Sequence, residues 1–249
     1  MEVQPKNERG DEVKLNDKDY LLLQVLCKSD ICNIRTLTIL NGAHVERVEL
    51  KRVHKLVKEG LIKQDMFNGH MVYALTRKGL SELEINRTPT ELRGYSVEHT
   101  EKIALIASWI YMATGRSIFD IDFSRNIKKY PEYDGKSVHV PDLVFGNTCV
   151  EVELNRKADN RLEKNFKDNA SLYSQQIWLI PERKHGLEAT LEKLSAKYDC
   201  KVDIRYMERV EKTFKEYELT NNEPRYIAIK PDNPPRARYK NIGRIEFDD

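Results

Sequence analysis

The stretch VHVPDLVFGNTCVEVEL, residues 138–154, predicts the fold of the second half of the chain. Residues 138–145 and 148–154 are apolar or alternating runs of strand length, and the Gly146-Asn147 dipeptide between them is typical of a tight turn. The two runs are therefore predicted to pair as an antiparallel hairpin.

The same hairpin carries acidic residues on both of its strands. Side chains alternate along a strand, so Glu151 and Glu153 are expected on one face about 6.6 Å apart, with Asp142 of the partner strand opposite them. Clustered carboxylates repel one another unless a hard cation lies among them, and Mg²⁺ prefers such oxygen ligands. The pattern predicts a metal site formed by Asp142, Glu151 and Glu153. The alternative is an edge strand whose charges face water.

Helices and strands are predicted to alternate on either side of this hairpin. Ser96 is expected to cap a helix that Gly115 ends, with apolar residues on one face. The further elements predicted are a strand at 118–123, a helix around 162–173, a strand at 177–180, a helix at 187–198 and a strand at 201–206. Residues 95–219 are therefore predicted to form an α/β domain with a mixed sheet, followed by an extended tail at 220–249 with a late strand at 226–230.

The N-terminal half has the element order of a winged helix-turn-helix. After a flexible arm at 1–14, three helices are expected, the first capped by Asn16 or Asp17 and the second by Asn33. Short strands at 61–62 and 71–75 flank Asn68-Gly69, a strong hairpin signal. The order predicts a domain at 15–85, joined to the next by a linker at 86–94.

The third predicted helix, 45–58, is amphipathic and basic. In a winged helix-turn-helix this helix enters the major groove, and the turn at 67–70 forms the tip of the wing. The predicted DNA-binding residues are Arg47, Lys51, Arg52, Lys55 and His70. The alternative is that these basic residues form the solvated face of a protein-docking module.

The composition and the motifs of the chain argue against several classes of protein. The 249 residues carry a net charge of only +2, so attraction to DNA must come from local patches. No apolar run is long enough to span a membrane, and a cytoplasmic protein is expected. The four cysteines lack the spacing of a zinc ribbon and are expected to be reduced. There is no phosphate-binding GxxxxGK[ST] loop, so an ATP-driven motor is not supported.

The hairpin, its Glu-x-Glu strand and the helix order resemble the PD-(D/E)xK nuclease-like superfamily. The resemblance implies a Mg²⁺ or Mn²⁺ site at Asp142 and Glu151, with Glu98 of the preceding helix as a further acidic residue. Where that superfamily usually has a lysine, this chain has Glu153. The resemblance therefore leaves the cationic role to Lys157, or to Lys164 of the next helix.

A closer resemblance covers residues 16–206. The segments LNDKD (15–19), YALTRKG (73–79) and VEVELNRK (150–157) resemble the replication-relaxation family of mobile elements. The resemblance implies a protein of a plasmid, phage or integrative element that handles double-stranded DNA, with replication or relaxosome proteins as further partners. A second copy of the chain, in a homodimer, is a further expected partner.

Two functions stay open at this point. In the first, the protein is a Mg²⁺-dependent endonuclease or nickase in which Asp142, Glu151 and Glu153 hold the metal, with Glu98 and Lys157 assisting. In the second, it is an accessory or regulatory DNA-binding protein whose nuclease-like domain has lost catalysis and contacts DNA or a partner protein.

Overall fold

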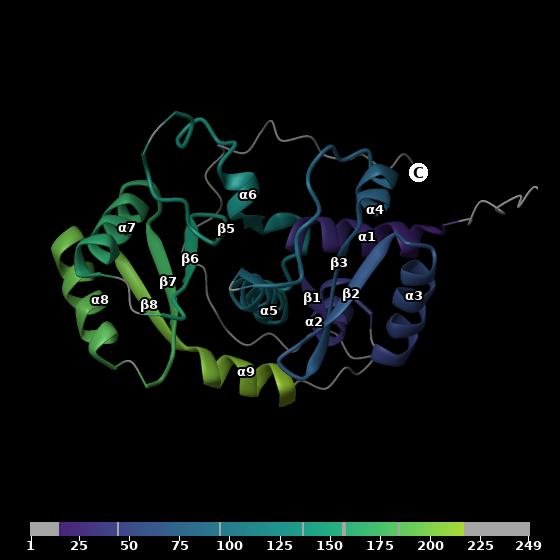
Figure 1. The fold of residues 1–249 in the computed structure, drawn as a ribbon. Coiled ribbons are helices and arrows are strands. Elements are labelled where there is room, and N and C mark those ends of the chain that lie inside the picture. The colour runs from purple at the N-terminus through teal and green to yellow at the C-terminus, as the bar shows by residue number, and fades with distance from the viewer. Residues whose placement is uncertain are drawn as a thin grey trace, which may run out of the picture.

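The computed structural model describes residues 15–216, apart from residues 44, 95, 136, 156, 157 and 184. Within this range the chain is a mixed α/β structure with a three-stranded and a five-stranded sheet (Figure 1). The predicted arm at 1–14, Lys157 and the predicted tail at 220–249 lie outside the described residues. Among the residues described, none of the helices combines the length and the apolar character needed to cross a bilayer.

Three helices open the described chain: α1 (Asp17–Ser29), α2 (Ile34–Leu40) and α3 (Glu46–Lys58). Asn16 caps α1 because its side chain accepts a hydrogen bond from the Asp19 amide, while the Asp19 carboxylate accepts one from the Asn16 amide. Asn33 caps α2 by accepting a hydrogen bond from the Thr36 amide. Both predicted caps are confirmed.

A small antiparallel sheet packs beside these helices, with its strands in the order β1 (Cys32–Asn33), β3 (His70–Leu75) and β2 (Ile62–Phe67). Phe67 pairs with His70, so the connection between β2 and β3 is the two-residue turn Asn68-Gly69. Both turn residues have positive φ, at 46° and 82°, as such a turn requires. β2 is longer than predicted because its polar residues 63–65 hide the strand pattern. α4 (Arg77–Glu82) follows, capped by Thr76.

Helix α5 (Ser96–Thr114) runs between the two sheets (Figure 1). The apolar pattern predicts one buried face, but every residue from 103 to 110 is buried. The helix is buried all round because the N-terminal helices cover one side of it and the larger sheet covers the other. Gly115, at φ 68°, follows its last residue as predicted.

The larger sheet has the order β4 (Asp122–Phe123), β5 (Leu143–Phe145), β6 (Thr148–Val152), β7 (Gln175–Ile180) and β8 (Lys201–Tyr206). The β4–β5 and β5–β6 pairs are antiparallel, whereas β6–β7 and β7–β8 are parallel. The predicted mixed sheet is therefore confirmed. Because β6 is the central strand, the alternative of an edge strand with solvated charges is wrong.

Helices cover both faces of this sheet. Val150 and Val152 point to the side packed against α5. On the opposite side, Trp178 and Ile180 pack against α7 (Asp159–Leu172) and α8 (His185–Tyr198). Glu151, which lies between the two valines, therefore faces the α7 side.

Several predicted elements are different in the structure. The strand predicted at 118–123 is a 3-10 turn, η1 (Ile118–Asp120), followed by the two-residue β4, and the strand predicted from 138 begins only at Leu143. Residues before Leu143 turn toward α7, where the His139 amide donates to the Asp168 carboxylate instead of pairing in the sheet. Helices α6 (Ser124–Ile127) and α9 (Met207–Glu216) were not predicted.

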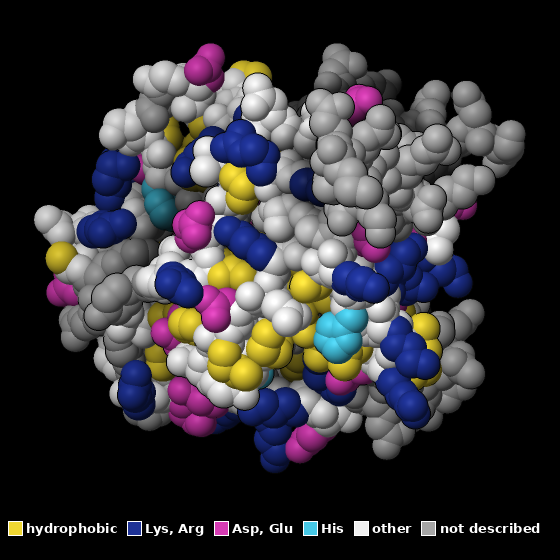
Figure 2. All heavy atoms as spheres, turned by 45° about the vertical axis from the view of Figure 1, so that its right-hand side comes forward, with side chains coloured by type: hydrophobic (Ala, Val, Ile, Leu, Met, Phe, Trp, Pro, Cys, Tyr) yellow, Lys and Arg dark blue, Asp and Glu magenta, His cyan; other side chains and the backbone are white. Residues whose placement is uncertain are grey.

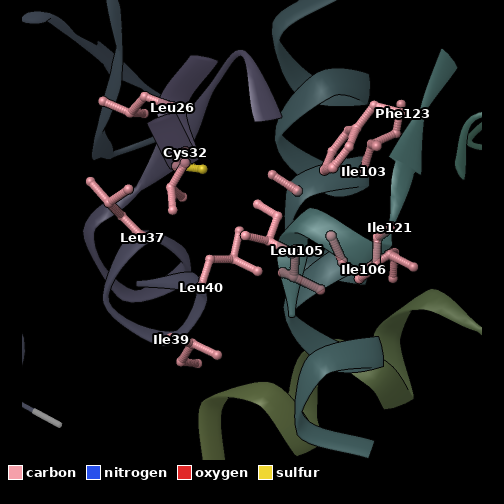
Figure 3. Packing of buried hydrophobic residues seen from close by; sticks show 14 of the residues in the cluster. Leu26, Cys32, Leu37, Ile39, Leu40, Ile103, Leu105, Ile106, Ile121 and Phe123 are labelled. Carbon is pink, nitrogen blue, oxygen red and sulfur yellow. The ribbon is translucent and has the colours of Figure 1, made fainter. Parts of the chain in front are cut away.

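Apolar packing continues across the predicted boundary at 86–94. That segment contains no helix or strand, but Arg87 fixes it to α1 by donating to the Asp30 carboxylate at 2.6 Å and to the Cys27 carbonyl at 2.7 Å. Figure 3 shows Leu40 of α2 and Leu105 of α5 pointing toward each other within one hydrophobic cluster. The N-terminal helices and the large sheet are thus joined through α5.

Candidate functional site

Asp142 and Glu151 are neighbours at the end of the β5–β6 pairing. The last paired residues are Leu143 and Val150, and the Asp142 amide also donates to the Val150 carbonyl at 3.2 Å, so the regular register does not continue to Asp142. The Asp142 carboxylate accepts a hydrogen bond of 2.8 Å from the Val152 amide, and its carbonyl accepts one from the Ser124 amide. Asp142 itself lies one residue before β5, not inside the strand as predicted.

Glu151 is the most enclosed carboxylate of this group, with 1% of its surface exposed. One carboxylate oxygen, Oε1, lies 2.6 Å from His139 Nε2 and accepts a hydrogen bond of 2.8 Å from Asn169 Nδ2. Burial raises the pKa of the Glu151 carboxyl, and the Asp142 charge adds to this, while the hydrogen bond to His139 acts in the opposite direction. Glu151 is therefore held in a network with α7 and with the segment before β5.

Helix α5 contributes His99 to this site, which the sequence analysis did not single out. His99 Nε2 lies 3.0 Å from the Val152 carbonyl oxygen and 3.5 Å from Asp142 Oδ2. The predicted acidic residue Glu98 precedes it on the helix and is exposed. The helical spacing could have indicated His99, because it lies on the same face of the helix as Ile103 and Ile106, which pack toward the sheet.

Glu153 follows β6 and is also buried, with 3% of its surface exposed. Its amide donates to the Leu179 carbonyl, which extends the pairing with β7 by one residue. The prediction that Glu153 shares a face with Glu151 assumed a continuous strand, but β6 ends at Val152 and Glu153 is the residue after it.

The cationic candidate that the structure describes, Lys164 of α7, is engaged elsewhere. Lys164 Nζ contacts Asp168 Oδ2 at 2.6 Å and donates to the Ser137 carbonyl at 2.9 Å. Asp168 in turn accepts the hydrogen bond from the His139 amide. Lys164 thus fastens the segment before β5 to α7.

The donor set does not fit a three-residue metal centre. Within residues 15–216, as far as they are described, no three His, Cys, Asp or Glu side chains lie together in a group that could hold a metal ion. Asp142 and Glu151 are neighbours, but each already accepts hydrogen bonds from the surrounding protein. Glu153 is buried after the end of β6 and does not complete such a group among the described residues.

The five predicted DNA-binding residues fall into two groups. Arg47 and Lys51 on α3 are exposed, as is Val48 between them, at 54%. Arg52 and Lys55 instead point to α1, where Arg52 Nε lies 3.5 Å from Asp19 Oδ1 and Lys55 Nζ lies 2.7 Å from Asp19 Oδ2. Arg47 and Lys51 are therefore the predicted cations of this helix whose side chains are not engaged with α1.

His70, at the predicted wing tip, is also engaged. Its Nε2 lies 2.6 Å from Glu101 Oε1 of α5. Lys and Arg side chains are scattered over the coloured part of the face in Figure 2, with Asp and Glu side chains among them. On this face, attraction to DNA would thus depend on individual open side chains.

Comparisons of the chain with protein-family models, with curated proteins and with solved structures gave no match.

Proposed function

We propose that this protein binds double-stranded DNA through α3 and that its larger sheet serves an accessory or regulatory role. The observation that carries the proposal is the outer face of α3, where Arg47, Val48 and Lys51 are exposed together. Two cations supply phosphate or guanine contacts, and an exposed valine can pack against a thymine methyl group.

The surroundings of α3 support this proposal. α2 and α3 form a helix pair joined by the short turn that contains Gly42, and the β2–β3 hairpin follows with β2 beside α3. This is the element order of a winged helix-turn-helix, in which the second helix of the pair reads DNA. On the family resemblance described above, the DNA would belong to a plasmid, phage or integrative element.

Salt dependence of duplex binding tests the proposal. Arg47→Ala with Lys51→Ala should weaken binding and lower the slope of log K against log salt by about 1.8, since each lost phosphate contact removes about 0.9. The control is Arg183→Ala with Lys193→Ala, which removes the same charge from exposed positions near and on α8. Equal affinity and equal slope in both double variants would contradict DNA binding by α3.

A second candidate function is metal-dependent cleavage of DNA by an endonuclease or nickase. The closeness of the Asp142 and Glu151 carboxylates favours it, because two neighbouring carboxylates can share a divalent cation. The hydrogen bonds that already occupy both carboxylates, and the engagement of Lys164 with Asp168, favour the accessory role instead.

A nicking assay on supercoiled plasmid with Mg²⁺ or Mn²⁺ separates the two functions. We expect the parent protein to shift the plasmid in a gel and leave it supercoiled. Nicking that is lost in both Asp142→Asn and Glu151→Gln, with binding retained, would establish the cleavage function and overturn the accessory role.

A further inference from the structure

The β2–β3 hairpin is held against α5 by a buried carboxylate. Glu101 of α5 is 6% exposed, and its Oε1 lies 2.6 Å from His70 Nε2 and accepts a hydrogen bond of 2.9 Å from Asn33 Nδ2. The His70 side chain is 43% exposed, so the imidazole lies at the rim with Glu101 behind it. One oxygen thus binds both the hairpin and the residue that caps α2.

Two weaker ion pairs accompany this contact. Lys63 Nζ lies 3.7 Å from Glu91 Oε2, and Arg93 Nε lies 3.3 Å from Asp65 Oδ2. Glu91 and Arg93 are largely exposed, so these pairs are screened by water and each contributes little. The Glu101 contact differs because its carboxylate is buried, where leaving a charge without its partners is costly.

A duplex bound to α3 would compete for the same imidazole. β2 lies beside α3, and the turn at Asn68-Gly69 ends next to His70, the position from which a wing contacts the DNA backbone. A phosphate oxygen and the Glu101 carboxylate are both anionic acceptors for a protonated histidine. His70 cannot bond fully to both, and their negative charges repel each other.

We propose that Glu101 acts as an internal competitor of DNA phosphate, which holds His70 and thereby restrains duplex binding by the hairpin. This inference rests on the proposed function, because it describes the regulation of the same DNA-binding surface. Release of His70 from Glu101 would add one cationic contact to those of Arg47 and Lys51.

The test compares duplex affinity and salt slope at pH 6, where an imidazole in water is largely protonated. Glu101→Gln keeps the shape of the side chain and an oxygen for Asn33, but removes the charge that competes with phosphate. We expect roughly threefold to tenfold tighter binding and a slope larger by about 0.9. Glu91→Gln removes the same charge from the exposed Lys63 pair and should change affinity less than about twofold.

A variant of His70 shows whether the gain in duplex affinity comes from its imidazole. In the parent protein, where the imidazole already contacts Glu101, His70→Ala should change duplex affinity little. In the Glu101→Gln background, His70→Ala should abolish the gain in duplex affinity. If Glu101→Gln lowers the yield of folded protein, Glu101→Asp withdraws the carboxylate by one methylene and should show a smaller gain in the same direction.

The outcomes distinguish this inference from the proposed function. If the parent binds DNA through Arg47 and Lys51 but Glu101→Gln gains no affinity, the inference alone is overturned. It is also overturned if the gain persists after His70→Ala. If Arg47→Ala with Lys51→Ala leaves duplex binding unchanged, the proposed function fails and the inference fails with it.

Discussion

At the scale of single residues, the surroundings of a carboxylate decide what it can do. Glu151 and Glu49 are both buried, and burial raises the pKa of each carboxyl. Glu151 contacts His139 and Asn169, which lie outside β6, and Glu49 accepts hydrogen bonds from Asn41 before α3 and from Arg52 one turn along the same helix. Acidic residues in this protein therefore organise neighbouring segments as well as carrying charge.

The pKa of Glu151 predicts a pH dependence of stability. An unperturbed glutamate titrates near about 4.3, and in the folded protein the pKa is raised, mainly by burial. Between the two values the folded chain keeps a proton that the unfolded chain releases, so stability falls as the pH rises through this window. The free energy of unfolding of Glu151→Gln should not fall in this window, because glutamine does not titrate. The variant should therefore become more stable relative to the parent as the pH rises. Urea denaturation from pH 4 to pH 8 measures the difference; parallel curves would contradict the prediction.

Cysteine reactivity provides a second test at this scale. All four cysteines are free, and burial raises the pKa of Cys32 to about 12 and that of Cys149 well above its ordinary value. Because the thiolate is the reactive form, both should resist iodoacetamide at pH 8 until the protein unfolds. Cys27 is only partly buried and should react first. Mass spectrometry of the parent and of Cys27→Ser measures the order in which the cysteines are alkylated. Labelling of Cys32 before Cys27 would contradict the prediction.

At the scale of the element, α3 depends on polar anchors as well as on its apolar face. The Glu49 carboxylate accepts hydrogen bonds of 2.6 Å from Asn41 Nδ2 and from Arg52 Nη1, and Lys55 pairs with Asp19 of α1. These contacts set the rotation of α3, which turns Arg47 and Lys51 outward. The helix thus uses two of its cations to fix the position of two others.

Removal of the Glu49 anchor should be costly. Glu49→Ala leaves Arg52 and Asn41 without their buried acceptor, and we expect a loss of about 2–4 kcal/mol in the free energy of unfolding, reduced because Arg52 is partly exposed. Glu46→Ala breaks the more exposed pair with Arg35 and should cost less than about 1 kcal/mol. Urea denaturation compares the two variants, and equal losses would show that burial does not decide the effect.

At the scale of the whole molecule, α5 and α9 join the two sheets. α9 packs against α5 and reaches the N-terminal helices, where Arg35 donates to the carbonyls of Phe214 and Lys215 (Figure 1). Arg35 also pairs with Glu46, the first residue of α3. The last described helix is therefore linked to the candidate DNA-binding helix through the Arg35 guanidinium.

This shared core predicts one cooperative unfolding transition. The chain has two tryptophans, Trp109 on α5 and Trp178 on β7, which belong to different hydrophobic clusters. In Trp109→Phe and in Trp178→Phe, the fluorescence of the remaining tryptophan should change at the same urea concentration as the far-ultraviolet circular dichroism. Separate midpoints in either variant would mean that the two parts unfold independently.

Local chemistry made much of the fold predictable. The caps at Asn16 and Asn33, the Asn68-Gly69 turn and the buried strand before Pro181 rest on interactions within a few residues, and the structure confirms each of them. The short strand β4 and the late start of β5 were harder to predict. In those segments the backbone bonds to distant partners, such as Asp168 for His139, which no local pattern reveals.

The candidate sites also combine features that local sequence patterns predict with features that depend on distant contacts. The Gly146-Asn147 turn and the apolar runs beside it were enough to predict the β5–β6 hairpin, because both are local patterns. The predicted facing of Asp142 and Glu151 did not follow in the same way, because the regular pairing ends at Leu143 and Val150. Which charges are left open to a partner depended on contacts between residues far apart in the chain. His70 meets Glu101 across 31 positions, and Lys55 meets Asp19 across 36. A buried carboxylate needs a hydrogen-bond donor or a cation beside it, and tertiary packing decides which one lies close enough. The pairing therefore follows from the arrangement of helices in space and not from the order of residues.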